Sequence, residues 1–191
     1  DLGTIKLTLQ KFYRINGGST QLRGVASDIN IPDIYEYSKL REKDNPDALP
    51  WDEITKAEYS NWRYSLDLSP IKKASNERLK SNTAFNVIRD NAHWISEQND
   101  KVYTLNLKKY QEEQKQIKEA VKQIETSAKL TSELDVTALP EDLKKFEYDN
   151  GKLERFKQWV KLLRGDIYLD EAINVVNDMV IQKNVVYNSK N

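Results

Sequence analysis

The chain of 191 residues contains no cysteine and only one histidine, His93. Without cysteine it can form no disulfide, no thiolate zinc site and no cysteine nucleophile. A single histidine also excludes metal sites that need two, and leaves one candidate for a histidine-activated serine. His93 stands between Ala92 and Trp94 in a helical pattern. We therefore interpret it as a helix-surface or packing residue.

The sequence also has neither an excess of one charge nor a long hydrophobic run. Thirty Lys and Arg balance thirty Asp and Glu, and the isoelectric point is near 6.8. Nucleic-acid binding depends on a basic excess that displaces counterions, so we expect no nucleic-acid partner. No apolar stretch approaches the roughly 18 residues of a membrane span, so we expect no transmembrane segment. Because the chain begins at Asp1, close to a strand-like run, we expect it to belong to a longer protein.

Residues 1–32 predict a β-hairpin. Ile5, Leu7 and Leu9 alternate with polar residues, which is the period of a half-buried strand. Asn16-Gly17-Gly18 suits a tight turn because glycine adopts positive φ at little cost. Residues 22–25 can supply the return strand. Since an isolated two-stranded ribbon is marginal in water, we expect the hairpin to join a larger sheet, to pair elsewhere or to be poorly ordered.

The remainder predicts a connector followed by helices. Residues 33–50 have no periodicity and are rich in proline, aspartate and asparagine, so we predict a linker there and a helical domain over 51–191. Ser69-Pro70 predicts one helix start, Ser81 or Asn82 a second, and Asn106 a third.

The helix that follows Asn106 repeats apolar residues by three and four. We favour a long helix packed against a neighbour in the same domain over a dimerising coiled coil. Leu139-Pro140 breaks the pattern, Asn150-Gly151 predicts a turn, and a last helix carries Asp170 and Glu171 near its N-terminal end. The predicted fold class is α+β, mostly α, with an N-terminal β-hairpin followed by a helical C-terminal domain.

The residue patterns predict no catalytic, cofactor or metal site. Ser19 follows two glycines and Lys11 lies across the predicted hairpin, but nothing around Lys11 suggests the burial that a lysine base requires. Carboxylate pairs such as Asp170-Glu171 are expected by chance among thirty acids, and we assign them to helix surfaces. Gly17-Gly18 leads into a strand and not into the helix of a phosphate loop. We interpret the four tryptophans as helix-packing anchors: Trp51, Trp62, Trp94 and Trp159.

Residues 11–33 carry a specific resemblance. They closely resemble the last hairpin of the protease core in the carboxy-terminal processing peptidases, the Ser/Lys serine proteases of the tail-specific class. The residues that match the motif are Phe12, Tyr13, Gly17, Gly18, Ser19, Thr20, Gln21, Gly24, Asp28 and Pro32. Leu49, Pro50 and Trp51, followed by Asp52, are similar to a block that follows the core in the long, Gram-negative type. Residues 168–174 are similar to the last helix of that type.

The resemblance implies a periplasmic, ATP-independent endopeptidase whose PDZ domain recognises the apolar, unstructured C-terminal tails of its protein substrates. In that family the catalytic serine and a Gly-Lys-Gly block carrying the lysine base precede the hairpin. This sequence contains no Gly-Lys-Gly, so no catalytic residue is carried over. We therefore predict a non-catalytic C-terminal segment, without cofactor, that encloses substrate or docks an adaptor protein.

Two other interpretations remain open from the sequence. The chain could be an independent helical interaction module that retains a degenerate protease hairpin. It could also be an active enzyme that uses Ser19 and Lys11, which is the least favoured of the three.

Overall fold

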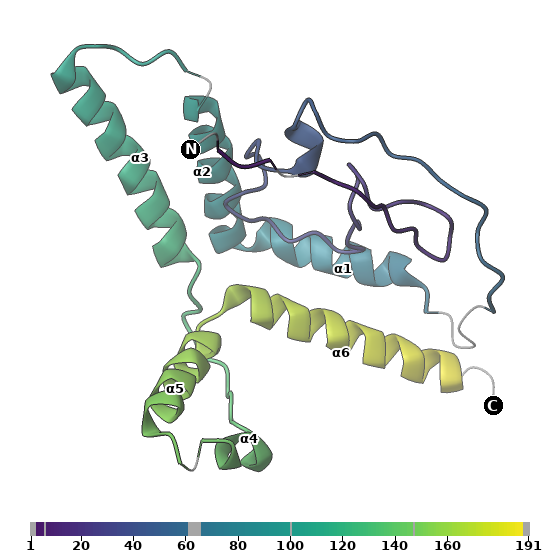
Figure 1. The fold of residues 1–191 in the computed structure, drawn as a ribbon. Coiled ribbons are helices and arrows are strands. Elements are labelled where there is room, and N and C mark those ends of the chain that lie inside the picture. The colour runs from purple at the N-terminus through teal and green to yellow at the C-terminus, as the bar shows by residue number, and fades with distance from the viewer. Residues whose placement is uncertain (1–2, 6, 61–65, 100, 147, 189–191) are drawn as a thin grey trace. The chain divides into compact units, whose positions relative to one another are not determined.

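The structure, a computed structural model, describes residues 3–5, 7–60, 66–99, 101–146 and 148–188. Helices dominate these residues, and no β-strand is formed among them (Figure 1). The chain divides into two compact units. Residues 1–30 and 38–65 make the N-terminal unit, and residues 31–37 and 66–191 make the helical unit. The helices are η1 (Glu42–Asp44), α1 (Leu68–Ser81), α2 (Thr83–Asn99), α3 (Leu107–Ser127), α4 (Pro140–Lys144), α5 (Asn150–Arg164) and α6 (Ile167–Asn188).

The predicted hairpin over residues 1–32 is present only as its turn. Arg14 and Gly18 are joined by an N–H···O bond of 2.9 Å, and Tyr13 and Ser19 form one isolated bridge instead of a ladder. Ile5, Leu7 and Leu9 are 86%, 71% and 85% exposed. Two strands without a further sheet bury too little apolar surface to hold a ladder together, which accounts for the shortfall.

The core of the helical unit draws on α1, α2, α3 and α6. Its buried members are Leu79, Phe85, Ile88, Ile124 and Ile167. The spacing of the α2 residues by three places them on one helical face, as the sequence predicts. Two further residues, Ile31 and Ile34, come from the segment between the two halves of the N-terminal unit and pack against this core. The helical unit therefore includes residues that lie ahead of position 51.

Two of the predicted helix starts are confirmed. The side-chain oxygen of Asn82 accepts a hydrogen bond from Ala84 N at 2.9 Å at the start of α2. The side chain of Asn106 caps α3 by accepting from Lys109 N at 3.2 Å. Both contacts satisfy N–H groups that have no acceptor within the helix. The long helix α3 packs along α2 within the same chain, which is the packing that its apolar spacing predicts.

Two other helix boundaries differ from the prediction. The helix α1 is capped by Asp67 and not by Ser69-Pro70, which lies inside its first turn. Asn150-Gly151 forms the first turn of α5 and not a loop, because Asp149 accepts a hydrogen bond from Lys152 N at 2.9 Å. In both cases an aspartate just upstream supplies the better cap. The residues read as boundary signals then fall within the first turn, where proline and glycine are tolerated.

A buried ionic network joins α1 to α6. The hydroxyl of Ser75 donates to Glu171 Oε1 at 2.7 Å, and Arg78 donates to both carboxylate oxygens at 2.8 Å and 3.0 Å. Glu171 is only 4% exposed, so the assignment of this residue to a helix surface is wrong. Arg78 also pairs with Asp178 at 2.8 Å. The bond to Glu171 raises the pKa of Arg78 against the effect of burial, and Asp178 adds to the rise.

Replacing Glu171 by alanine is expected to lower the free energy of unfolding by about 2–3 kcal/mol, because Ser75 and Arg78 lose their shared acceptor in a buried site. The loss stays moderate because Arg78 is 31% exposed and retains Asp178. Urea unfolding followed by circular dichroism measures it. The matched control is Glu154→Ala, which removes an exposed pair with Lys157 and should change stability by less than about 0.5 kcal/mol. Equal losses in the two variants would contradict the role of the network.

Candidate functional site

The two motif blocks in the N-terminal unit lie against each other. The turn at residues 16–19 packs on residues 51–54 through backbone hydrogen bonds. Ser19 N donates to Asp52 O at 3.0 Å, and Ile54 N donates to Gly17 O at 2.9 Å. We call this arrangement the Gly–Trp junction, consisting of residues 13–19 and 50–54. It brings together two blocks that are about thirty residues apart in the sequence.

Gly17 is required by this close approach. It has φ +90°, a conformation that side chains disfavour, and it is buried. A Cβ atom at this position would collide with the carbonyl oxygen of Ile54. Gly18 faces the ring of Trp51, where a Cβ would lie at a tight 3.3 Å. The paired glycines therefore serve the contact with the second block as well as the turn itself.

Trp51 lies at the centre of the junction. Its indole Nε1 donates to Ser19 O at 3.0 Å. The guanidinium carbon of Arg23 lies 3.7 Å from the centre of the Trp51 ring, within the range of a cation–π contact. The assignment of Trp51 as a helix-packing anchor is wrong, since it packs on a turn. Trp159 on α5 is half exposed, and Trp62 lies outside the described residues.

A polar cluster around Asp52 completes the junction. Tyr13 Oη donates to Asp52 Oδ2 at 3.0 Å, and Lys11 Nζ lies 3.3 Å from the same oxygen. Burial acts to raise the pKa of Asp52, but hydrogen bonds involving Tyr13, Ser19 and Lys11 outweigh it and hold that pKa below its ordinary value. The bond to Asp52, with burial and the negative charge, raises the pKa of Tyr13.

Ser19 and Lys11 are engaged by this cluster. Ser19 is 4% exposed, and its hydroxyl oxygen accepts a bond from Asp52 N at 3.3 Å. Lys11 Nζ donates to Pro50 O at 3.2 Å in addition to its pairing with Asp52. A nucleophile must face its substrate, and a lysine base must be free of such a carboxylate partner. These contacts favour a structural role for both side chains.

The structure brings six of the motif residues into the junction and leaves the others outside it. Those within it are Tyr13, Gly17, Gly18, Ser19, Pro50 and Trp51.

Among the others, Thr20 O accepts from Gly24 N at 2.8 Å, and Gln21 O accepts from Arg23 N, so these residues form the next turn. Phe12, Asp28 and Leu49 are exposed. Pro32 is buried in the helical unit, where its carbonyl accepts from Tyr168 Oη at 3.1 Å.

Two contributors to the junction, Asp52 and Arg23, were not among the predicted site residues. Asp52 directly follows Trp51, so its place in the block is a signal that could have found it. Arg23 carries no local signal, because its contact with Trp51 depends on the fold.

His93 lies on α2, where its Nδ1 is 3.5 Å from Glu97 Oε1 and the Tyr37 ring meets it edge-on. In the part of the chain that the structure describes, no group of three or more His, Asp or Glu residues could hold a metal ion. None of the helices described is both long enough and apolar enough to cross a membrane.

Comparison with known proteins identifies the family. Residues 35–181 match the family described as the C-terminal domain of tail specific protease. The chain belongs to this family, which confirms the resemblance drawn from the motifs. The chain is also similar to the tail-specific protease of Haemophilus influenzae, with 53% identity over 58 residues. That alignment covers 30% of this chain and 8% of the relative.

Replacing Gly17 by alanine is expected to open the Gly–Trp junction, because the added Cβ has no space beside Ile54 O. Amide exchange measured by NMR at Ser19 and Ile54 should accelerate at least about tenfold. The control is Gly24→Ala, which also has positive φ but has nothing within 4 Å of the added carbon. It bears only the backbone penalty of roughly 1 kcal/mol, within its own turn. If both variants open the junction equally, the close approach is not what selects Gly17.

Acidification is expected to weaken the same junction. Since the pKa of Asp52 is lower in the folded chain than the ordinary value of about 3.9, its contribution to stability is complete above about pH 4. The contribution is lost as pH falls through the folded pKa. Amide protection of Ser19 and Ile54 should therefore fall between about pH 4 and pH 2. In Asp52→Asn the protection should be lower throughout and flat over this window. The same pH dependence in that variant would exclude Asp52 as its source.

Proposed function

We propose that the chain is a non-catalytic C-terminal segment of a periplasmic, ATP-independent serine endopeptidase of the Ser/Lys type. The parent protease degrades proteins with apolar, unstructured C-terminal tails. Membership of the C-terminal domain family and the similarity to a tail-specific protease support this proposal. The sequence has no Gly-Lys-Gly block, Ser19 is buried in the Gly–Trp junction, and Lys11 is paired with Asp52 of the junction.

The observation that carries the proposal is the exposed apolar alternation ahead of the junction. Ile5, Leu7 and Leu9 all present their side chains to solvent. Alternating apolar residues with no covering layer fit a strand that adds to a sheet contributed by another part of a protein. The Gly–Trp junction fixes the turn that follows this segment. We infer that residues 5–25 complete a hairpin at the edge of the protease core sheet.

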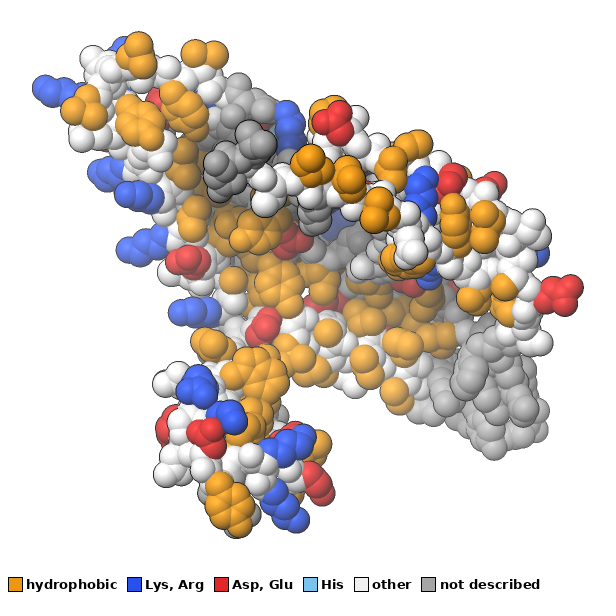
Figure 2. All heavy atoms as spheres, viewed as in Figure 1, with side chains coloured by type: hydrophobic (Ala, Val, Ile, Leu, Met, Phe, Trp, Pro, Cys, Tyr) orange, Lys and Arg blue, Asp and Glu red, His pale blue; other side chains and the backbone are white. Residues whose placement is uncertain are grey.

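The helical unit has an apolar surface of its own. Ile173, Val176 and Val180 follow one side of α6 and are 42–55% exposed, and Figure 2 shows hydrophobic side chains gathered along this helix. A helix that is apolar on more than one side is usually covered by another layer. This surface supports a role in which the helical unit surrounds the protease core, encloses substrate or docks an adaptor.

The gene upstream of the codon for Asp1 is expected to encode a PDZ-like region, a serine turn and a Gly-Lys-Gly block. The full gene product should then cleave a fluorogenic peptide with an apolar C-terminus, whereas the 191-residue chain should not. Ser19→Ala in the full product should leave kcat within about twofold, and replacing the Gly-Lys-Gly lysine should abolish cleavage. A start codon and signal peptide directly before Asp1, or Ser19-dependent cleavage by the chain alone, would contradict the proposal.

Hydrogen exchange provides an independent measurement of the hairpin in the same two proteins. Residues 5–15 should exchange fast in the 191-residue chain and slowly in the full gene product, because the added sheet supplies partners for their N–H groups. Helix α2 should be protected in both and serves as the internal control. Slow exchange over residues 5–15 in the monomeric chain alone would favour an independent helical module.

A further inference from the structure

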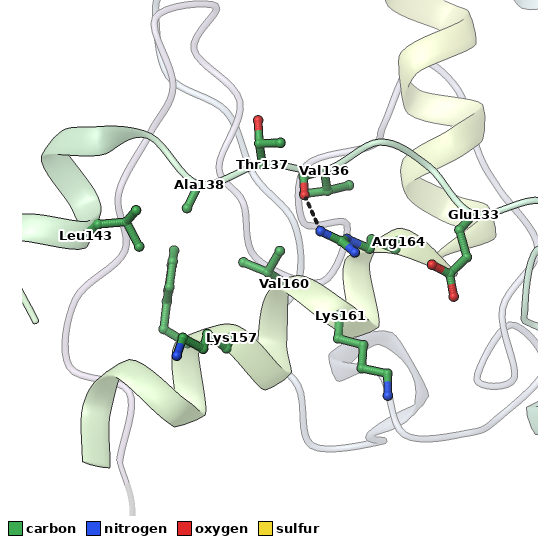
Figure 3. Close-up of a pocket in the computed structure, with 10 residues that line it drawn as sticks. Glu133, Val136, Thr137, Ala138, Leu143, Lys157, Val160, Lys161 and Arg164 are labelled. Carbon is green, nitrogen blue, oxygen red and sulfur yellow. Dashed lines mark hydrogen bonds between the residues drawn. The ribbon is translucent and has the colours of Figure 1, made fainter. Parts of the chain in front are cut away.

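A groove runs along α5 in the helical unit. Its volume is about 410 Å³, within the range of sites that take a ligand. We call it the α5 groove. Figure 3 shows Ala138, Leu143 and Val160 around the same opening, with the head group of Arg164 beside Val136. The apolar lining consists of Val136, Ala138, Leu143, Phe156 and Val160.

The groove exists because the segment between α3 and α5 is fixed to α5 at both ends. At one end, Leu134 N donates to Arg164 O at 2.8 Å, and Arg164 Nη2 donates to Val136 O at 3.3 Å. At the other end, the rings of Phe146 and Phe156 stack with centres 4.9 Å apart. Between these anchors, residues 137–143 do not close onto Val160. The opening is therefore supported by specific contacts on both sides.

The rim of the groove is cationic. Lys157, Lys161 and Arg164 all line it, and Glu133 is the one acidic residue among its lining residues. Lys157 pairs with Glu154 at 2.8 Å, but both side chains are more than half exposed, so this surface pair contributes little and leaves Lys157 able to turn to a ligand. Lys161 and Arg164 have no ion pair with a carboxylate in the described part of the chain, and Arg164 Nε is buried there without a hydrogen-bond partner. Like charges spaced by three or four residues on a helix repel one another. The position of Lys161 and Arg164 in the last turn of α5 offsets part of this repulsion, and an acidic ligand would compensate the remainder.

We propose that the α5 groove binds an acidic, apolar peptide segment of a partner protein. An apolar side chain of the segment fills the space beside Val160, and its carboxylates meet the cationic rim. From Lys157 to Arg164 there are seven residue steps along α5, which is roughly 10 Å at 1.5 Å per residue. A single carboxylate cannot span that distance, so the complementary ligand carries at least two. This inference concerns binding by the chain itself and does not depend on its place in a protease.

Two other ligands share part of this chemistry. A peptide with an apolar C-terminus offers one carboxylate, which would leave most of the rim uncompensated. An anionic lipid offers negative charge, but a groove of about 410 Å³ is too small for a pair of acyl chains. The length of the cationic row and the size of the cavity therefore favour the acidic segment over both.

The test uses the 191-residue chain and a fluorescein-labelled peptide of about 12 residues, acetylated and amidated, in which Leu and Phe alternate with Glu. Fluorescence anisotropy should show saturable binding, and the amides of Thr137, Ala138 and Val160 should shift in NMR spectra. The double variant Lys157→Glu, Lys161→Glu should weaken binding at least about tenfold. The control is Lys118→Glu, which reverses one lysine charge at an exposed site on α3. It should change the affinity for the peptide less than about twofold.

A second variant tests the cavity without changing charge. Ala138→Trp fills the space beside Val160 and should abolish binding while the circular dichroism spectrum and melting temperature stay close to those of the parent chain. A peptide in which Lys replaces each Glu should not bind. Saturable binding with these responses supports the proposal.

Three results would overturn it. The first is the absence of saturable binding of the acidic peptide. The second is equal or tighter binding of a Gln-substituted peptide with a free carboxy-terminus, insensitive to the double variant, which would indicate a site for one carboxylate. The third is groove-dependent binding to vesicles of equal phosphatidylcholine and phosphatidylglycerol without peptide binding, which would indicate a lipid site.

Discussion

The buried carboxylate of Glu171 is the interaction on which the arrangement of the helical unit depends. Apolar contacts between two helices are non-directional and allow one helix to slide or rotate on the other. The guanidinium of Arg78 and the hydroxyl of Ser75 can all donate to Glu171 only when its two carboxylate oxygens lie in one position. That placement sets α6 on α1. The segment that follows α3 contacts the residues between α5 and α6, because Leu130 N donates to Gly165 O at 2.9 Å.

The N-terminal unit depends on backbone geometry instead of a core. No large apolar side chain within the Gly–Trp junction is fully buried, and its order comes from Gly17, the indole of Trp51 and the polar cluster of Asp52. Such a unit gains little from the hydrophobic effect. It is suited to act as a fixed turn between a strand and the rest of the protein, which is how it enters the proposed function.

Features set by neighbours in the sequence could be predicted. A helix start at Ser81 or Asn82 and another at Asn106 are predictable because a cap acts on residues two or three positions away, and the structure selects Asn82 from the first pair. The apolar spacing of α2 and the packing of α3 within the chain followed from helical periodicity alone. The motif resemblance identified the family, and it named both sides of the Gly–Trp junction without showing that they touch.

Features set by distant residues could not be predicted. Glu171 resembles a surface carboxylate until Ser75 and Arg78, more than ninety residues earlier, are placed beside it. The strands of the predicted hairpin depend on a partner sheet, so residues 5–9 alone cannot supply them. The α5 groove has no sequence signature, because its opening results from two anchors on either side of residues 137–143.

The path of the chain between its two units has a consequence for how such proteins can be recombined. Residues 31–37 belong to the helical unit, yet residues of the N-terminal unit precede and follow them. A single crossover within this region therefore cannot transfer one unit whole without dividing the other. A cut after residue 50 would leave the helices without Ile31 and Ile34, and would separate Trp51 from its glycines. An exchange between relatives that keeps both units intact therefore needs its breakpoints outside this interleaved region.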